Sequence, residues 1–190
     1  MIQNGHHGVK LSKSVTIKDY LEFAKTEDRG SIARLLQSRF EERYIGPVMR
    51  SSPGHKSGFA MMAIACLTIE AFESFRSGWT KPKNEKAFKK YFLAQPEFGI
   101  SGDEISAFYA NIRCGILHDA ETRGGWKILR KGPIVDTSAR TINATGFLIT
   151  LHASISAYCT ELKASDWHGV KWSCIRKKFD SIIDRSKSEN

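Results

Sequence analysis

The segment from Ser57 to Ser77 is the most apolar part of the chain, and it constrains the fold more than any other feature. Its longest mainly apolar run, Phe59 to Ile69, is much shorter than the roughly 20 residues that a helix needs to cross a membrane. We therefore expect a buried helix at the centre of the protein, and no membrane segment. Two charged residues, Glu70 and Glu73, nevertheless lie within this helix.

The segments on either side of this central helix also show helical periodicity, in which apolar residues recur every three or four positions. The spacing predicts further helices over residues 16–26, 31–44, 85–94, 101–123, 144–164 and 170–185. A loop rich in glycine, proline and serine, residues 46–58, precedes the central helix. The sequence thus predicts a mainly α fold, a helical bundle of five to seven helices.

Composition suits a single domain over residues 1–190, because 41% hydrophobic and 26% charged residues are ordinary values for a soluble globular protein. We expect residues 1–15 to form a flexible N-terminus. No secretory signal peptide opens the sequence, so we expect a cytoplasmic location. The four cysteines are far apart, which predicts free, mostly buried thiols and no metal site or disulfide framework.

Residues 125–142 lack helical periodicity. Along a strand, Trp126, Ile128 and Arg130 would alternate with Lys127, Leu129 and Lys131, and Gly132 and Pro133 form a turn signal before the next short apolar segment. We expect a small β-hairpin here, inserted before the last two helices of the bundle.

The helix expected over residues 101–123 has two distinct faces. Ser101 and Glu104 have the spacing of a capping box, and Gly124 and Gly125 are expected to end the helix. At about 100° per residue, one side is apolar and faces the core; its members are Ile105, Phe108, Tyr109, Ile112 and Ile116. The opposite side carries small residues, which are Ser106, Ala107, Ala110 and Cys114. Small residues let a second helix approach, either from the bundle or from the same face of a two-fold partner.

Arg113 and His118 flank this small-residue face. Histidine can take and return a proton near neutral pH, and arginine offers planar, permanently charged donors that match phosphate oxygens. Together they could cleave a phosphodiester without a metal ion or another cofactor. The spacing alone is unspecific, because Arg50 and His55 repeat it in a loop.

A formal net charge of +9 favours binding to polyanions such as RNA. Positive charge concentrates in residues 76–91 and 170–179, where aromatic residues lie among the cations. Such segments occur on nucleic-acid-binding surfaces and equally on solvated helix faces.

The pattern Arg113-x4-His118, late in a small helical bundle, resembles the Arg-x4-6-His signature of the HEPN superfamily (higher eukaryotes and prokaryotes nucleotide-binding domain). The resemblance covers about residues 57–164. Many members of that family are metal-independent endoribonucleases, often toxins or antiviral defence effectors, whose two motifs face each other in a homodimer. The resemblance therefore implies that Arg113 and His118 are the catalytic pair, that RNA is the substrate, and that a regulatory or antitoxin partner restrains the activity.

Supporting roles follow less directly. Family members often add an acidic residue from a neighbouring helix, which here implies Glu70 as the partner of Arg113, whereas Glu73 is expected to pair with Arg76 at the surface. Asn111 and Glu121 share the face of His118 and could orient it, contact RNA or be solvated.

Three residues after the motif helix are candidates for RNA contact. Trp126, Lys127 and Arg130 follow closely enough to border a cleft at the end of the helix, although an amphipathic hairpin alone would show the same pattern. Cys114 stands where the family commonly has a polar residue. That departure favours an alternative, a non-catalytic helical module that binds nucleic acid or a partner protein.

Overall fold

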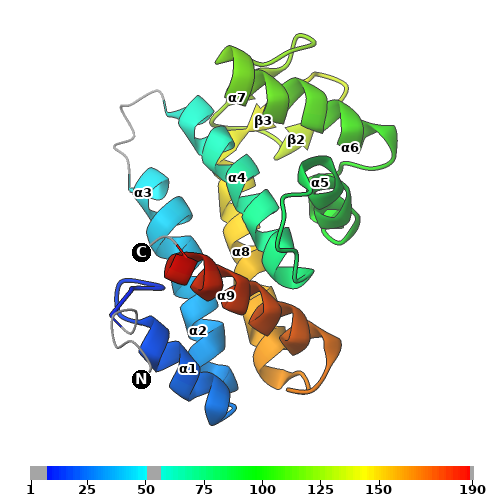
Figure 1. Cartoon of the computed structure of the whole chain (residues 1–190). Coiled ribbons are helices and arrows are strands. Elements are labelled where there is room, and N and C mark those ends of the chain that lie inside the picture. The colour runs from blue at the N-terminus through cyan, green and yellow to red at the C-terminus, as the bar shows by residue number, and fades with distance from the viewer. Residues whose placement is uncertain (1–7, 51–56, 189–190) are drawn as a thin grey trace.

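The structure is a computed structural model that describes residues 8–50 and 57–188, and it is mainly helical (Figure 1). In chain order the helices are α1 (Ile17–Lys25), α2 (Arg29–Phe40), α3 (Gly46–Met49), α4 (Gly58–Arg76), α5 (Asn84–Leu93), α6 (Asp103–Phe108), α7 (Cys114–Asp119), α8 (Ala144–Ala164) and α9 (Val170–Ser188). Short π-helical turns join α2 to α3 and α6 to α7. When joined helices are counted once, the described residues form seven helices, which confirms the expected bundle.

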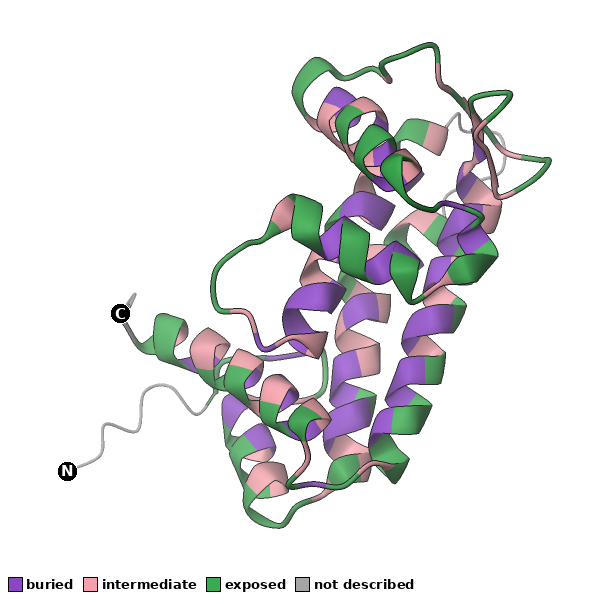
Figure 2. Ribbon diagram, turned by 90° about the vertical axis from the view of Figure 1, so that its right-hand side faces the viewer, coloured by how far each residue is buried: buried purple, intermediate pink, exposed green. Residues whose placement is uncertain are grey.

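Helices α4 and α8 pack against each other along the length of the molecule, and the other helices surround them (Figure 1). Helix α2 packs along α8, while α9 and α5 pack against α4. The inward faces are buried and the outward faces are exposed (Figure 2). Helices at both ends of the chain contribute to one continuous core, through residues such as Tyr20 of α1 and Phe179 of α9. The terminal helices are therefore integral parts of the bundle.

Helix α4 is the central helix, as its sequence predicts. It is long and apolar enough to span a membrane by length and composition alone, but 56% of its apolar window is buried inside the protein. Burial of this kind is what the core helix of a bundle shows. Its Glu73 pairs with Arg76 at 2.6 Å, as expected, yet the Glu73 side chain is fully buried instead of lying at the surface. Burial raises the pKa of Glu73, and the Arg76 charge opposes that rise.

Two expectations near the N-terminus need correction. Within the expected flexible segment, residues 8–15 are packed on the bundle: Leu11 is buried, and its carbonyl accepts hydrogen bonds from Arg39 and Arg43 of the second helix. The loop expected from residue 46 starts later, because the π-helical turn Glu41–Ile45 continues the helix to Met49. Pro47 lies in the first turn of α3, directly after the π-helical turn.

The expected β-hairpin is a three-stranded sheet with a different pairing. Strand β3 (Thr141–Asn143) lies in the middle, parallel to β1 (Lys127–Leu129) and antiparallel to β2 (Val135–Asp136). The first two strands therefore do not pair with each other. Strand β3 lies between them and is anchored by two of its residues. Ile142 is fully buried, and the Asn143 side chain caps α8 and donates a hydrogen bond to the Gly132 carbonyl.

The motif helix is continuous from Asp103 to Asp119, with the π-helical turn η4 (Tyr109–Arg113) in its middle. At its start only half of the capping box forms, in which the Ser101 amide donates to the Glu104 carboxylate. The helix ends earlier than expected, at Ala120, which has a positive φ of 56°. The chain can fold back there because residue 115 is a glycine. A Cβ at this position would lie only 2.5 Å from the Glu121 carbonyl oxygen.

The buried face of the motif helix packs against a cluster of aromatic side chains. The Phe108 ring stacks on Phe147 of α8 at 5.7 Å between centroids, and Phe92 of α5 meets Phe108 edge-on at 5.0 Å. Phe98 packs against Phe147 at 4.6 Å. The buried apolar face of the helix, Ile105, Phe108, Ile112 and Ile116, agrees with the expected core side, while Tyr109 is only half-buried. These contacts fix the position of the helix relative to α5 and α8.

Candidate active site

Arg113 lies where the motif helix crosses α4, and it forms an ion pair with Glu70 of that helix. Arg113 Nε donates to Glu70 Oε1 at 2.7 Å, and Nη2 donates to Oε2 at 3.4 Å. The side chains of Arg113 and Glu70 are only 11% and 18% exposed, so solvent screens the pair less than a surface ion pair. The pairing expected for Glu70 is confirmed.

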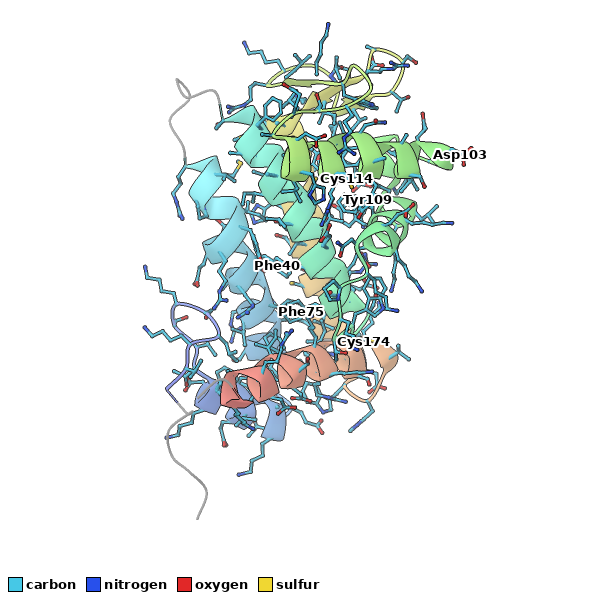
Figure 3. All side chains as sticks on the ribbon, turned by 45° about the horizontal axis from the view of Figure 1, so that its top comes forward. Phe40, Phe75, Asp103, Tyr109, Cys114 and Cys174 are labelled. Carbon is cyan, nitrogen blue, oxygen red and sulfur yellow. The ribbon has the colours of Figure 1, made fainter. Side chains whose placement is uncertain are left out.

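The π-helical turn accounts for the inward direction of Arg113. A helical wheel with uniform spacing places Arg113 at the edge of the solvent-facing side, next to the small residues. A π-helical turn contains an extra residue and rotates everything after it relative to a regular helix. Figure 3 labels Tyr109 and Cys114, the first residue of the turn and the first after it, where the helix passes over α4.

Two neighbours add to the environment of Arg113. Its guanidinium lies over the Tyr109 ring at 5.5 Å from the centroid, and the Cys114 thiol lies beside both side chains. Partial burial lowers the pKa of Arg113, but the hydrogen bond and charge of Glu70 more than offset this, so its pKa is raised. Burial is also the main cause of the raised pKa of Tyr109. Arg113 is therefore a fixed, permanent cation.

His118 lies in the last turn of α7, on the opposite side of Arg113 from Glu70. Its Nε2 atom is 3.5 Å from Arg113 Nη1, and the residue is exposed. A guanidinium can only donate, so this contact is a hydrogen bond when the His118 ring is neutral with its proton on Nδ1. The structure thus brings the two motif residues together, with one basic ring nitrogen directed at the guanidinium and the ring open to solvent.

Two of the predicted supporting residues, Asn111 and Glu121, have partners other than His118. The Asn111 carbonyl accepts from the Arg123 amide, and its side chain lies under Gly124, so it anchors the segment after the helix. Glu121 is exposed and accepts from the Thr122 amide at 2.9 Å. We see no hydrogen bond from Asn111 or Glu121 to His118 in the described part of the chain.

The residues predicted to contact RNA are spread around the small sheet. Trp126 lines an open cavity of about 350 Å³ together with Asn111 and Arg140. Lys127 is exposed on β1. Arg130 is engaged in the fold, because its Nε donates to Thr145 Oγ1 at 2.6 Å and its Nη1 to Ser57 Oγ at 3.1 Å.

Sequence reasoning assigned Tyr109 to the core and missed its contact with Arg113. The spacing of an aromatic residue four positions before an arginine is the signal that could have found it. Arg140 was missed as well, because only the pairing of β3 with β1 brings it to the same cavity as Asn111. His55, from the second Arg–His pair, lies outside the described residues.

The small-residue face of the motif helix is open to solvent at Ser106, Ala107 and Ala110, and Cys114 is half-buried. All four cysteines are free, but only Cys66 and Cys159 are buried, fewer than expected. Among residues 8–50 and 57–188, no three histidine, cysteine, aspartate or glutamate side chains lie close enough together to hold a metal ion.

The site therefore consists of a guanidinium fixed by a carboxylate and an exposed imidazole in contact with it, at the surface of a basic protein. Such a pair can bind an anionic phosphate oxygen and exchange a proton beside it. Comparisons with models of protein families, with curated proteins and with solved structures find no match for this chain.

Proposed function

We propose that the protein is a metal-independent endoribonuclease of HEPN type, with Arg113 and His118 as its catalytic residues. The contact between the fixed Arg113 guanidinium and the exposed His118 ring carries the proposal. Its resemblance to that family rests on the Arg-x4-His motif, and the helical fold is compatible with it. In this proposal the protein acts in the cytoplasm, as a toxin or defence effector restrained by a regulatory partner.

The proposed reaction is attack of a ribose 2′-hydroxyl on the adjacent phosphorus. The bound substrate replaces the contact between Arg113 Nη1 and His118 Nε2, and Nε2 then takes the hydroxyl proton as the 2′-oxygen–phosphorus bond forms. Arg113 Nη1, the nitrogen not bonded to Glu70, stabilises the negative charge that develops on the nonbridging oxygens. The bond from phosphorus to the 5′-oxygen breaks and that oxygen takes up a proton, which leaves a 2′,3′-cyclic phosphate and a 5′-hydroxyl.

A two-fold homodimer would supply the second proton carrier that this reaction uses. One His118 can act as the base and the other as the acid that protonates the leaving 5′-oxygen. The exposed small residues Ser106, Ala107 and Ala110 would allow two motif helices to approach closely. Such an arrangement would also bring two Arg113 side chains to one cationic cleft.

The test of this function uses a labelled RNA and its mapped cleavage site. We expect cleavage in the presence of EDTA, with products that end in 2′,3′-cyclic phosphate and 5′-hydroxyl groups. A single 2′-deoxy substitution at the mapped site should abolish cleavage there, because it removes the attacking hydroxyl. Cleavage that continues at the deoxy position, or that EDTA prevents, would contradict the proposal.

Glu70 is a positioning residue in this proposal, which predicts a specific kinetic effect. Glu70→Gln keeps the shape of the side chain but removes the charge that holds Arg113, so we expect kcat to fall about 10- to 100-fold with little change in KM. The control is Glu22→Gln, an exposed glutamate on α1, which should leave both constants unchanged. Equal kinetics for Glu70→Gln and wild type would show that Arg113 does not depend on this contact.

The alternative function is a non-catalytic module that binds RNA or a partner protein. It is favoured by the engagement of two Arg113 nitrogens with Glu70, which leaves fewer donors for a reacting phosphate. In that case Arg113→Ala would weaken binding and reduce its salt dependence, and wild-type protein would yield no cleavage product.

A further inference from the structure

Two connected hollows run along the surface of α4, starting at Glu70 of the candidate active site. The first, of about 220 Å³, extends from Glu70 past Ala71 and Ser74 to α9, and the second, of about 240 Å³, continues from Ala71 and Ser74 to Arg39 of α2. We call them together the α4 trough. Glu70 and Ser74 are one helical turn apart, so this part of the trough extends about 6 Å along α4.

The α4 trough is lined by cations that come from distant parts of the sequence. Lys83 belongs to the segment before α5, Lys178 and Arg185 belong to α9, and Arg39 closes the far end. Two of them come from the two basic segments, residues 76–91 and 170–179, so the fold brings these segments to opposite sides of one hollow. The rings of Phe40 and Phe75, labelled in Figure 3, lie at 5.8 Å from each other at its far end.

The described residues that line the trough carry more positive than negative charge. Glu70 is the one acidic side chain among the described residues that line the trough, and Arg113 neutralises it. Lys178 donates to the Trp79 carbonyl and Arg39 to the Leu11 carbonyl, and neither forms an ion pair with a carboxylate of the described chain.

The cations also disfavour one another. Burial, together with the charge of Arg43, lowers the pKa of Arg39 to about 10. Burial likewise lowers the pKa of Lys178, with further contributions from Arg185 and Arg39. Holding like charges together in a partly buried hollow costs folding free energy, which a bound anion would offset.

We propose that the α4 trough binds the phosphate groups of an RNA strand that extends from the active site. His118, Arg113, Glu70 and the trough follow one another in space through their contacts, so a strand whose reacting phosphate lies at Arg113 would continue over Ala71 and Ser74. Lys83 and Lys178 contact its phosphates there. The trough recognises the RNA backbone, so binding there is independent of base sequence. This proposal rests on the proposed function, in that RNA is the ligand.

The test measures RNA binding in the His118→Ala background, so that the strand is not cut. Lys83→Gln with Lys178→Gln removes two trough charges, and Lys25→Gln with Lys163→Gln removes two exposed charges elsewhere, at the ends of α1 and α8. Fluorescence anisotropy with a labelled single-stranded RNA is recorded between about 50 and about 200 mM salt. We expect the trough variant to bind about 10-fold more weakly, with a salt slope smaller by about 1.4, since each lost contact to a single strand removes about 0.7.

The control variant should stay within about twofold of the parent protein with an unchanged slope. Lys83→Gln alone should reduce the slope by about 0.7. Lys83 is exposed and this change leaves Lys178 in place, so the single variant keeps the test valid if the double variant is less stable than its parent. Equal losses for trough and control variants, or no RNA binding by either, would overturn the proposal.

The two proposals fail in different ways. If wild type does not cut RNA but the trough variants bind it more weakly, the trough stands and the nuclease proposal fails. If wild type cuts RNA and the trough variants bind like the control, only the trough proposal fails.

Discussion

His118→Ala should lower the rate of RNA cleavage by about 10³-fold or more, because it removes the group that carries the proton in the reaction. The free energy of unfolding should stay within about 0.5 kcal/mol of wild type, because the side chain is exposed. His168→Ala is the matched control, since His168 is also exposed, with its side chain 76% accessible, and lies far along the chain after α8. The measurement is a single-turnover cleavage rate beside a denaturant unfolding curve.

Arg113→Ala should abolish cleavage to a similar degree, but with a second effect that His118→Ala lacks. It leaves the Glu70 carboxylate without its partner in a partly buried place, so the free energy of unfolding should fall by about 1–3 kcal/mol. Arg34→Ala, an exposed arginine of α2, should affect neither quantity. Substantial cleavage by Arg113→Ala or His118→Ala would show that the pair is not catalytic.

The largest effect on stability is expected for Phe147→Ala, at about 3–5 kcal/mol of unfolding free energy. Phe147 is fully buried in α8 and contacts the rings of Phe98 and Phe108, so its removal leaves a cavity directly below the motif helix. Because Phe108 is one turn from Arg113, the loss should also reduce cleavage in protein that remains folded.

Ile149→Ala provides the comparison on the same helix. Ile149 is 51% exposed, so its truncation should cost about 0.5 kcal/mol or less in unfolding free energy. Denaturant unfolding of both variants checks the prediction. Similar losses for Phe147→Ala and Ile149→Ala would mean that the aromatic cluster does not support the motif helix.

Much of the helical framework could be predicted because periodicity records which face of each segment is buried. The most apolar segment is the central helix α4, and the buried face of the motif helix carries Ile105, Phe108 and Ile112, as its spacing indicates. Asparagine directly before a helix is a favoured N-cap, and the Asn143 side chain caps α8. Each of these features depends on residues close together in the sequence.

The errors arose where distant contacts or an irregular turn decide the structure. A uniform helical wheel could not predict the π-helical turn that directs Arg113 at Glu70, although the pair itself was expected. A turn signal at Gly132 and Pro133 suggested a hairpin, but the buried Ile142 makes β3 the central strand. Leu11 holds residues 8–15 on the bundle through partners on the second helix, which local composition cannot reveal.

The α4 trough was beyond prediction for the same reason. Its cations Arg39, Lys83 and Lys178 are far apart in the sequence, and only the packing of α2 and α9 around α4 brings them together. The basic segments could be recognised from composition, but composition does not distinguish a binding surface from a solvated helix face. Their shared hollow next to Glu70 now favours the binding surface.

The most direct test of the account is incubation of wild type and His118→Ala with total RNA in EDTA, followed by mapping of the product ends. The account predicts that wild type produces fragments with 2′,3′-cyclic phosphate and 5′-hydroxyl ends, and that His118→Ala produces none above background. Identical fragments from both proteins, or ends that carry a 5′-phosphate, would contradict it.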